Sequence, residues 1–268
     1  MSGTSQNHTK LLALDMDGTT VNNHGEISEA TINSLRLARE KGAQICFVTG
    51  RSEFEMYPLA KHFPYADYLI VDTGAKITHL ATGEVLLHEC LDPREAEIVV
   101  DYFLRKKRLL HIKAGRFWGA TLWDESVEAF ARYANYQPVI IREPSEAPLT
   151  EIDSFCVYGY PSRAALDRLI EREQLNLYTM HSQPHYYDVL QHGITKWHAV
   201  SFLAQRLRIP SEDIIAVGNF SNDVEMIKKA GLGIAVRNAS EDAKAAADYI
   251  TRRSNHRNAI GEVVDMFL

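Results

Sequence analysis

The sequence predicts an α/β fold, with a doubly wound parallel sheet into which a separate α+β module is inserted. The chain has 268 residues, 46% of them apolar, so it can bury a sizeable core. A stretch near each end alternates short apolar runs with helical patterns, and the region between these stretches does not. Such alternation is typical of parallel strands joined by right-handed helical crossovers.

The N-terminal stretch supplies the first three strands. Residues 10–15 form an apolar run that ends in a polar loop at Asp15, as a buried parallel strand does. Ser28 is placed to cap the next helix, which stops at Gly42. The elements expected after it are a strand over residues 44–48, a helix over 53–62 and a strand over 68–71.

The middle of the chain has a different pattern. Residues 77–88 are typical of a hairpin around Thr82 and Gly83. Beyond it we expect helices over residues 92–107, 125–133 and 163–173, and β-strands over 111–113, 139–141, 154–158 and 186–190. We therefore assign residues 1–84 and 190–268 to the parallel-sheet core and residues 85–189 to the inserted module.

The parallel-sheet pattern returns in the last third of the chain. We expect helices over residues 196–207, 224–230, 241–247 and 259–267, and strands over 213–217 and 232–236. Ligands of doubly wound sheets bind at the carboxyl ends of the strands. Asp15 and Thr49 both fall at such ends, which indicates where a site lies.

Composition argues against several classes of partner. The formal net charge is −6, and the basic run at residues 105–108 falls at an expected helix end, so neither nucleic acid nor an anionic membrane is an expected partner. No apolar segment approaches a membrane span or a signal peptide. Cys46, Cys90 and Cys156 are odd in number and far apart, which favours reduced thiols and a cytoplasmic protein.

Two carboxylates at the end of the first strand indicate chemistry. Asp15 and Asp17 are followed by Gly18, which permits a turn that brings both toward one site. Neighbouring carboxylates repel unless a cation or proton intervenes, and Mg²⁺ suits such oxygen ligands together with a substrate phosphate. One carboxylate could attack phosphorus while the other transfers protons. Taken alone, an Asp-Gly turn is more often simply solvated.

Four motifs that occur in order along the chain favour the catalytic interpretation over a solvated turn. They are Asp15-Met16-Asp17-Gly18-Thr19, Thr49-Gly50-Arg51, Lys196 at the start of a helix, and Gly218-Asn219 with Asn222-Asp223. With them the sequence resembles the haloacid dehalogenase superfamily of aspartate-nucleophile phosphatases, in particular its Cof-type members with a type IIB α+β cap. The resemblance covers essentially the whole chain, and it implies that the inserted module is that cap.

The resemblance implies a role for each matching residue. Asp15 would be the nucleophile and a magnesium ligand, and Asp17 the general acid and base, with its backbone carbonyl on the metal. Lys196 would neutralise the transferring phosphoryl group. The implied phosphate-binding residues are Met16, Thr49, Gly50, Lys196 and Asn222, and the implied metal ligands are Asp15, Asp17, Asn219 and Asp223. Asp223 would either orient Lys196 or hold a metal-bound water.

Three positions depart from the family pattern. Asn219 stands where an acidic metal ligand is usual, so weaker metal binding is expected. Thr73 replaces a frequent asparagine, and Trp197 a frequent glycine.

In the cap, residues 116–118 and 185–187 could reach over a substrate, although packing or surface roles are the simpler explanation. The spacing of His181, His185 and His192 matches no metal-binding pattern.

The sequence therefore predicts magnesium-dependent hydrolysis of a small phosphorylated metabolite through an aspartyl-phosphate. Sugar phosphates, nucleotides, flavin mononucleotide and pyridoxal phosphate all remain open as substrates. One alternative is a sugar phosphomutase of the same superfamily, and another is a non-catalytic phosphate-binding regulator, for which Asn219 is the support. We expect a monomer or a weak homodimer.

Overall fold

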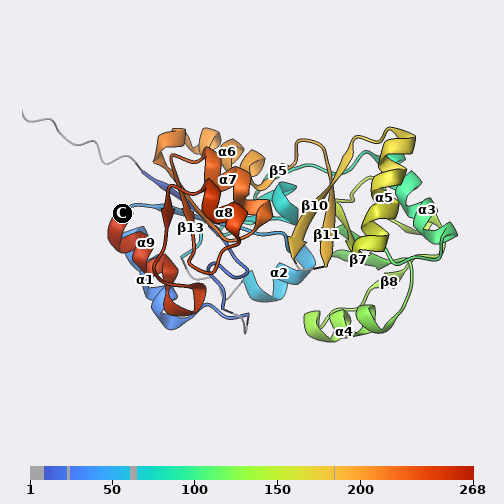
Figure 1. Cartoon of the computed structure of the whole chain (residues 1–268), viewed down its shortest axis with the longest axis horizontal. Coiled ribbons are helices and arrows are strands. Elements are labelled where there is room, and N and C mark those ends of the chain that lie inside the picture. The colour runs from blue at the N-terminus through green and yellow to red at the C-terminus, as the bar shows by residue number, and fades with distance from the viewer. Residues whose placement is uncertain (1–8, 23–24, 61–64, 184) are drawn as a thin grey trace, which may run out of the picture.

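The computed structural model describes residues 9–22, 25–60, 65–183 and 185–268, and within them the chain forms two sheets (Figure 1). The strands of the larger sheet are, in spatial order, β14 (Tyr249–Ile250), β13 (Leu232–Ala235), β12 (Ile214–Gly218), β1 (Leu11–Asp15), β2 (Gln44–Val48), β3 (Tyr68–Val71), β4 (Lys76–His79) and β5 (Val85–His88). Strands β14 to β3 run parallel, and β4 and β5 form an antiparallel hairpin at one edge. This confirms the predicted parallel-sheet core.

Helices cover both faces of this sheet. They are α1 (Glu29–Glu40), α2 (Glu53–Ala60), α6 (Lys196–Leu207), α7 (Val224–Lys229), α8 (Glu241–Ala246) and α9 (Ala259–Phe267). Because successive side chains of a strand point to opposite faces, Leu12 and Leu14 of β1 pack in a cluster with α1, α8 and α9, while Leu11 and Ala13 pack against α6. Fully apolar strands are what a sheet covered on both faces needs.

The smaller sheet is built from the middle of the chain. Its strands are, in spatial order, β10 (Leu177–Gln183), β11 (Tyr186–Gln191), β9 (Ser154–Tyr158), β6 (His111–Ala114), β7 (Phe117–Ala120) and β8 (Val139–Ile140). All neighbours pair antiparallel except β7 and β8. Helices α3 (Pro93–Arg105) and α5 (Tyr160–Glu173) contribute to its main core, and α4 (Glu125–Ala134) packs with Trp118 and Phe54.

Several predicted element boundaries can be compared with the structure. Ser28 accepts a hydrogen bond from the backbone amide of Thr31 at 3.2 Å and caps α1. The helix expected over residues 53–62 is present as α2, and positions 61–62 lie outside the described residues. Strand β5 pairs with β4, so the larger sheet extends past residue 84, the expected last residue of the first core segment.

Three strands have no counterpart among the predicted elements: β7, β10 and β14. Strand β10 mixes polar and apolar residues, β7 contains a glycine, and β14 is only two residues long at the sheet edge. Each is stabilised by its neighbours in the sheet more than by its own local pattern. Among the described residues, no helix is long and apolar enough to cross a membrane.

Candidate active site

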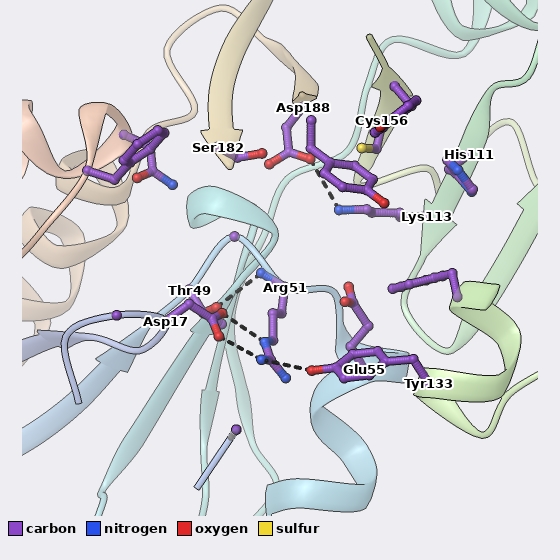
Figure 2. Close-up of a pocket in the computed structure, with 18 of the residues that line it drawn as sticks. Asp17, Thr49, Arg51, Glu55, His111, Lys113, Tyr133, Cys156, Ser182 and Asp188 are labelled. Carbon is purple, nitrogen blue, oxygen red and sulfur yellow. Dashed lines mark hydrogen bonds and ion pairs between the residues drawn. The ribbon is translucent and has the colours of Figure 1, made fainter. Parts of the chain in front are cut away.

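A cavity of about 830 Å³ opens at the carboxyl ends of β1, β2 and β12 and is closed from the other side by the smaller sheet and α4 (Figure 2). Six predicted site residues line it, namely Asp15, Asp17, Thr49, Gly50, Asn219 and Asn222. The side chains of the other three, Met16, Lys196 and Asp223, are buried. The structure thus brings segments from both ends of the chain to one place.

The loop after β1 is a tight turn that the sequence requires. The carbonyl oxygen of Met16 accepts hydrogen bonds from the backbone amides of residues 19–21, at 3.2, 3.0 and 2.8 Å. Gly18 has φ +76°, and a Cβ there would collide with the side chain of Asn219. Glycine therefore serves both the left-handed backbone and the close approach of the loop carrying Asn219. The turn leaves Asp15 facing the cavity.

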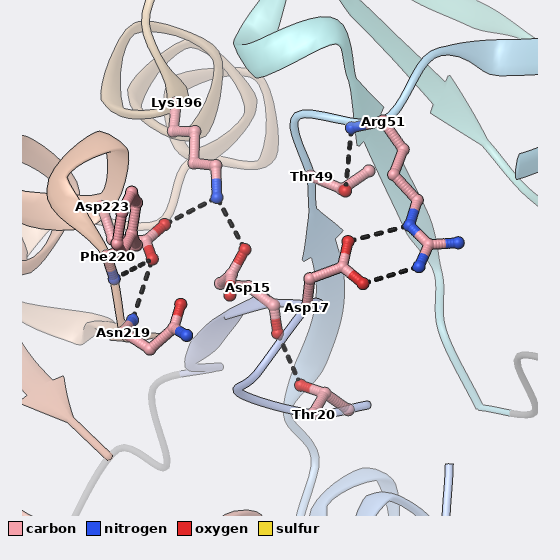
Figure 3. A network of polar contacts seen from close by, with 9 residues as sticks. All are labelled: Asp15, Asp17, Thr20, Thr49, Arg51, Lys196, Asn219, Phe220 and Asp223. Atoms are coloured by element: carbon pink, nitrogen blue, oxygen red, sulfur yellow. Dashed lines mark hydrogen bonds and ion pairs between the residues drawn. The ribbon is translucent and has the colours of Figure 1, made fainter. Parts of the chain in front are cut away.

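Lys196 lies between two carboxylates (Figure 3). Its Nζ is 2.6 Å from Asp15 Oδ1 and 2.6 Å from Asp223 Oδ1, and its side chain is 1% exposed. The second oxygen of Asp223 accepts hydrogen bonds from the backbone amides of Asn219 at 2.8 Å and Phe220 at 3.1 Å. Both oxygens of Asp223 are therefore engaged by protein donors, and Asp223 orients both Lys196 and the loop after β12.

The positive charge of Lys196 does not fully offset the burial of Asp15 and the negative charge of its neighbours. Burial and the neighbouring Asp223 raise the pKa of Asp15 above its ordinary range, and Lys196 only partly opposes them. Burial alone would lower the pKa of Lys196, but Asp15 and Asp223 raise it above its usual value, so the lysine is a cation. The second oxygen of Asp15, Oδ2, is buried with no hydrogen-bond partner in the structure. Such an oxygen calls for a further cation or hydrogen-bond donor.

Thr49 and Gly50 form a concave surface beside Asp15. Thr49 Oγ1 accepts a hydrogen bond from the backbone amide of Arg51 at 3.1 Å, which leaves its own proton available to a ligand. A Cβ on Gly50 would lie 3.3 Å from Thr73 Oγ1 and 3.7 Å from Asn222 Nδ2. Glycine thus keeps space open among several hydrogen-bonding groups, as a phosphate site needs.

Asp17 is held by Arg51, a contact that sequence reasoning missed. Arg51 Nε donates to Asp17 Oδ2 at 2.8 Å, and Arg51 Nη2 donates to Asp17 Oδ1 at 2.6 Å (Figure 3). Arg51 also donates to the hydroxyl of Tyr133 on α4 at 3.4 Å. Asp17 therefore points toward Arg51 and not toward Lys196. The motif Thr49-Gly50-Arg51 contained the signal, but only its first two residues were given roles.

The donor set near Asp15 fits a magnesium ion. Mg²⁺ takes oxygen ligands, often one or two carboxylates together with waters and a substrate phosphate. The unpartnered Oδ2 of Asp15 and the side-chain oxygen of the neighbouring Asn219 are oxygen donors of this kind. Asn219 contributes no charge, so the site has one negative ligand fewer than an acidic residue would give.

A second buried polar cluster was not foreseen, and two of its members, Lys113 and Asp188, line the cavity. Lys113 Nζ of β6 is 3.3 Å from Asp188 Oδ1 of β11 and 4.0 Å from Asp72 Oδ1, and Ser154 Oγ donates to that Asp72 oxygen at 2.8 Å. Asp72 and Thr73 have φ values of +47° and +56°, in the left-handed region that non-glycine residues rarely adopt. Strain of this kind is concentrated at functional sites.

The candidate cap residues divide between lining and packing. Trp118 and Tyr186 line the cavity, although Trp118 is 1% exposed and donates to His111 Nδ1 at 3.1 Å. His181 stacks on Tyr187 and packs edge-on against Phe220 of the loop after β12, so it joins the two sheets at a residue that lines the cavity. The lining found among the described residues does not include Arg116, Phe117, His185 or Tyr187.

Comparison with known proteins gives a consistent result. A family model described as haloacid dehalogenase-like hydrolase matches residues 12–264. The chain is 30% identical to the putative phosphatase YxeH of Bacillus subtilis, over 95% of this chain and 98% of that protein. It is 27% identical to the 5-amino-6-(5-phospho-D-ribitylamino)uracil phosphatase YcsE of Bacillus subtilis, over 90% and 89% of the two chains.

Solved structures share the fold. A haloacid dehalogenase-like hydrolase from Bacteroides thetaiotaomicron superposes with a TM-score of 0.84 at 25% identity, and the match covers 97% of this chain and 100% of that one. The likeness therefore extends over both sheets, including the inserted segment.

Proposed function

This chain belongs to the haloacid dehalogenase-like hydrolases and is a phosphatase, and from that premise we propose that it hydrolyses the phosphate monoester of a small metabolite through a phosphoryl group carried on Asp15, with Mg²⁺ as cofactor. The observation that carries the proposal is the state of the Asp15 carboxylate. One oxygen is paired with Lys196 at 2.6 Å, and the other is buried, unpartnered and on a residue that lines the cavity.

In the first half of the reaction, one carboxylate oxygen of Asp15 attacks phosphorus and the bond from phosphorus to the leaving oxygen breaks. Lys196, the Thr49 hydroxyl, the Asn222 amide and the backbone amides of Met16 and Gly50 stabilise the negative charge on the transferring phosphoryl group. Asp17 donates a proton to the leaving oxygen.

In the second half, Asp17 accepts a proton from a water molecule as that water attacks phosphorus. The bond from phosphorus to Asp15 then breaks, which releases phosphate and restores the carboxylate. Arg51 donates a hydrogen bond to each carboxylate oxygen of Asp17 and so fixes the orientation of that side chain. To act first as an acid, Asp17 must take up a proton and turn away from Arg51 toward the leaving group.

Asp15, Asn219 and the backbone carbonyl of Asp17 are the proposed metal ligands, with Asp223 acting through Lys196 and a metal-bound water. When bound, the ion supplies the positive charge that Asp15 Oδ2 lacks and brings the substrate phosphate to it. Because Asn219 is neutral, we propose that Mg²⁺ binds more weakly here than at a site with a carboxylate in that position.

The segment that forms the smaller sheet is proposed to act as the cap. Because β5 belongs to the larger sheet and β11 ends at Gln191, its proposed extent is residues 89–191 and not the expected 85–189. It supplies the far wall of the cavity, where Lys113 and Asp188 provide a cation and an anion for polar groups of the substrate. A wall of this kind excludes bulk water and selects the leaving group. We propose a cytoplasmic monomer or weak homodimer, in keeping with the three unpaired thiols.

A phosphate-release screen tests the proposal. The panel contains sugar phosphates, nucleotides, flavin mononucleotide, pyridoxal phosphate and a ribityl phosphate, each with and without Mg²⁺, beside Asp15→Asn. We expect magnesium-dependent release from at least one compound, and none with Asp15→Asn. Isomerisation of a sugar phosphate without phosphate release, dependent on a bisphosphate activator, would instead identify a mutase. Tight binding without release would identify a regulator.

A further inference from the structure

A second cluster of metal-ligating side chains lies outside the active site, where the chain leaves the larger sheet. It consists of His88 at the end of β5, Cys90 two residues later, and Asp153 directly before β9 of the smaller sheet. Their three ligand atoms all lie within 4.8 Å of one another. Among the described residues, this is the group of three His, Cys, Asp or Glu side chains that could hold a metal ion. None of the three belongs to the lining described for the cavity at Asp15.

We propose that His88, Cys90 and Asp153 form a binding site for a zinc-like transition-metal ion, distinct from the magnesium site. The atoms that would bind it are His88 Nε2, Cys90 Sγ and Asp153 Oδ1. Nitrogen, thiolate sulfur and carboxylate oxygen together are the donor set that Zn²⁺ accepts, whereas Mg²⁺ requires oxygens.

The spacing of the three atoms suits a tetrahedral ion. Nε2 of His88 is 2.6 Å from Oδ1 of Asp153, Sγ of Cys90 is 3.5 Å from Nε2, and Sγ is 4.0 Å from Oδ1. Zinc bonds of about 2.0 to 2.3 Å place tetrahedral ligand atoms roughly 3.3 to 3.7 Å apart. The sulfur distances already approach this range, and the histidine and carboxylate need to separate by less than about 1 Å.

The surroundings of Asp153 favour a cation. Its side chain is fully buried, and its second oxygen accepts a hydrogen bond from the backbone amide of Gly115 at 2.6 Å. That amide would keep the carboxylate oriented after Oδ1 binds metal, as outer partners of metal ligands do.

His88 and Cys90 are partly exposed, so they give a metal ion access to the site from solvent. The side chain of His88 is 34% exposed, and Cys90 is half-buried and unpaired, so an ion can enter from solvent and keep a water as fourth ligand. Binding displaces the proton shared by His88 and Asp153 and the thiol proton of Cys90. The site joins the last strand of the larger sheet to the smaller sheet, so a bound ion would tie these two parts together (Figure 1).

Cobalt(II) is the probe, titrated at mildly alkaline pH into the metal-free full-length chain with excess Mg²⁺ to occupy the oxygen site. We expect tetrahedral cobalt bands and a sulfur-to-cobalt charge-transfer band that saturate at one ion per chain. Cys90→Ser should remove the charge-transfer band and weaken binding about tenfold or more. His88→Asn should weaken binding comparably, and Zn²⁺ should displace the cobalt.

Matched controls separate the cluster from other thiols and imidazoles. Cys46→Ala removes a thiol in β2, and His79→Asn removes an imidazole at the other end of the β4–β5 hairpin, so both should bind cobalt like the parent chain. Zn²⁺ should raise the melting temperature of the parent but not of Cys90→Ser. The proposal is overturned if no charge-transfer band forms, if the band survives in Cys90→Ser, or if excess Mg²⁺ abolishes it.

Discussion

At the scale of single residues, reactivity depends on which contacts each carboxylate lacks. Asp15, Asp17 and Asp223 stand within one small region, yet their surroundings differ. Both carboxylate oxygens of Asp223 accept hydrogen bonds, and both oxygens of Asp17 accept hydrogen bonds from the guanidinium of Arg51. Asp15 keeps one oxygen without a partner. A buried anion with an unsatisfied oxygen is costly unless it binds something. That asymmetry is the physical reason to assign the nucleophile to Asp15 and the proton transfers to Asp17.

Replacing Asp17 by Asn removes the proton donor and keeps the shape of the side chain. For an alkyl phosphate, which must be protonated as it leaves, we expect kcat to fall by about 10² to 10⁴. For p-nitrophenyl phosphate the leaving group needs no proton, so the rate of phosphoryl transfer should fall far less. Pre-steady-state release of leaving group from both substrates measures the difference. Equal losses for the two would exclude Asp17 as the acid.

The residues of the site that could be predicted are those fixed by local motifs. Asp15, Thr49 and Asn222 each lie at or just after the end of a parallel strand, and the topology then brings them together. Arg51 was visible in its motif, but its partner Asp17 lies 34 positions away. Lys113 and Asp188 are 75 positions apart. Their pairing depends on β6 and β11 both lying beside β9, which no local pattern encodes.

At the scale of elements, the fold follows periodicity where burial is uniform. Strands β1, β2 and β12 are continuous apolar runs, and the sequence predicts them to within a residue at either end. Strand β10 has the sequence LYTMHSQ and gains its structure from pairing with β11. The inserted sheet was therefore the harder part to predict, because antiparallel strands with mixed faces carry a weaker signal.

His111 of β6 should make stability fall in acid. Burial lowers its pKa from 6.5 to about 4, with Lys113 adding to the effect. The unfolded chain therefore binds more protons than the folded chain between these two values, and stability is lost as the pH falls from 6.5 toward 4. The loss should approach about 3 kcal/mol.

Urea unfolding across this pH range checks the His111 prediction. His111→Asn retains an oxygen that can accept the hydrogen bond from Trp118 and should show a shallower loss in acid than the parent chain. His79→Asn, which removes a histidine of the exposed hairpin, is the control and should follow the parent. Parallel curves for the parent and His111→Asn would contradict the assigned burial effect.

At the scale of the whole molecule, the two sheets share one cavity and are joined by buried polar contacts. Ser154 at the start of β9 donates to Asp72 after β3, and Phe54 of α2 stacks on Trp118 of β7 with ring centroids 5.6 Å apart. These contacts hold the smaller sheet over the proposed phosphate site. The surface proposed to select the leaving group is therefore also the surface through which the two sheets contact each other.

Lys113→Met tests that dependence. It leaves Asp188, which is 3% exposed, buried without its cation, so we expect a loss of roughly 3 kcal/mol in the free energy of unfolding. Adding Asp188→Asn should recover much of the loss, since the uncompensated charge is then gone. Urea unfolding of the two single variants and the double variant measures the coupling. Additive losses would mean that the pair does not interact.

The most direct test of the account is to isolate the phosphoryl-enzyme. Asp17→Asn is mixed with p-nitrophenyl phosphate and Mg²⁺ and quenched in acid, and the peptide containing Asp15 is analysed by mass spectrometry. We expect that peptide to gain the mass of one phosphoryl group, with the modification on Asp15 and none in Asp15→Asn. Turnover by the parent chain with no modified peptide at any time, or a phosphoryl group on another residue, would contradict the account.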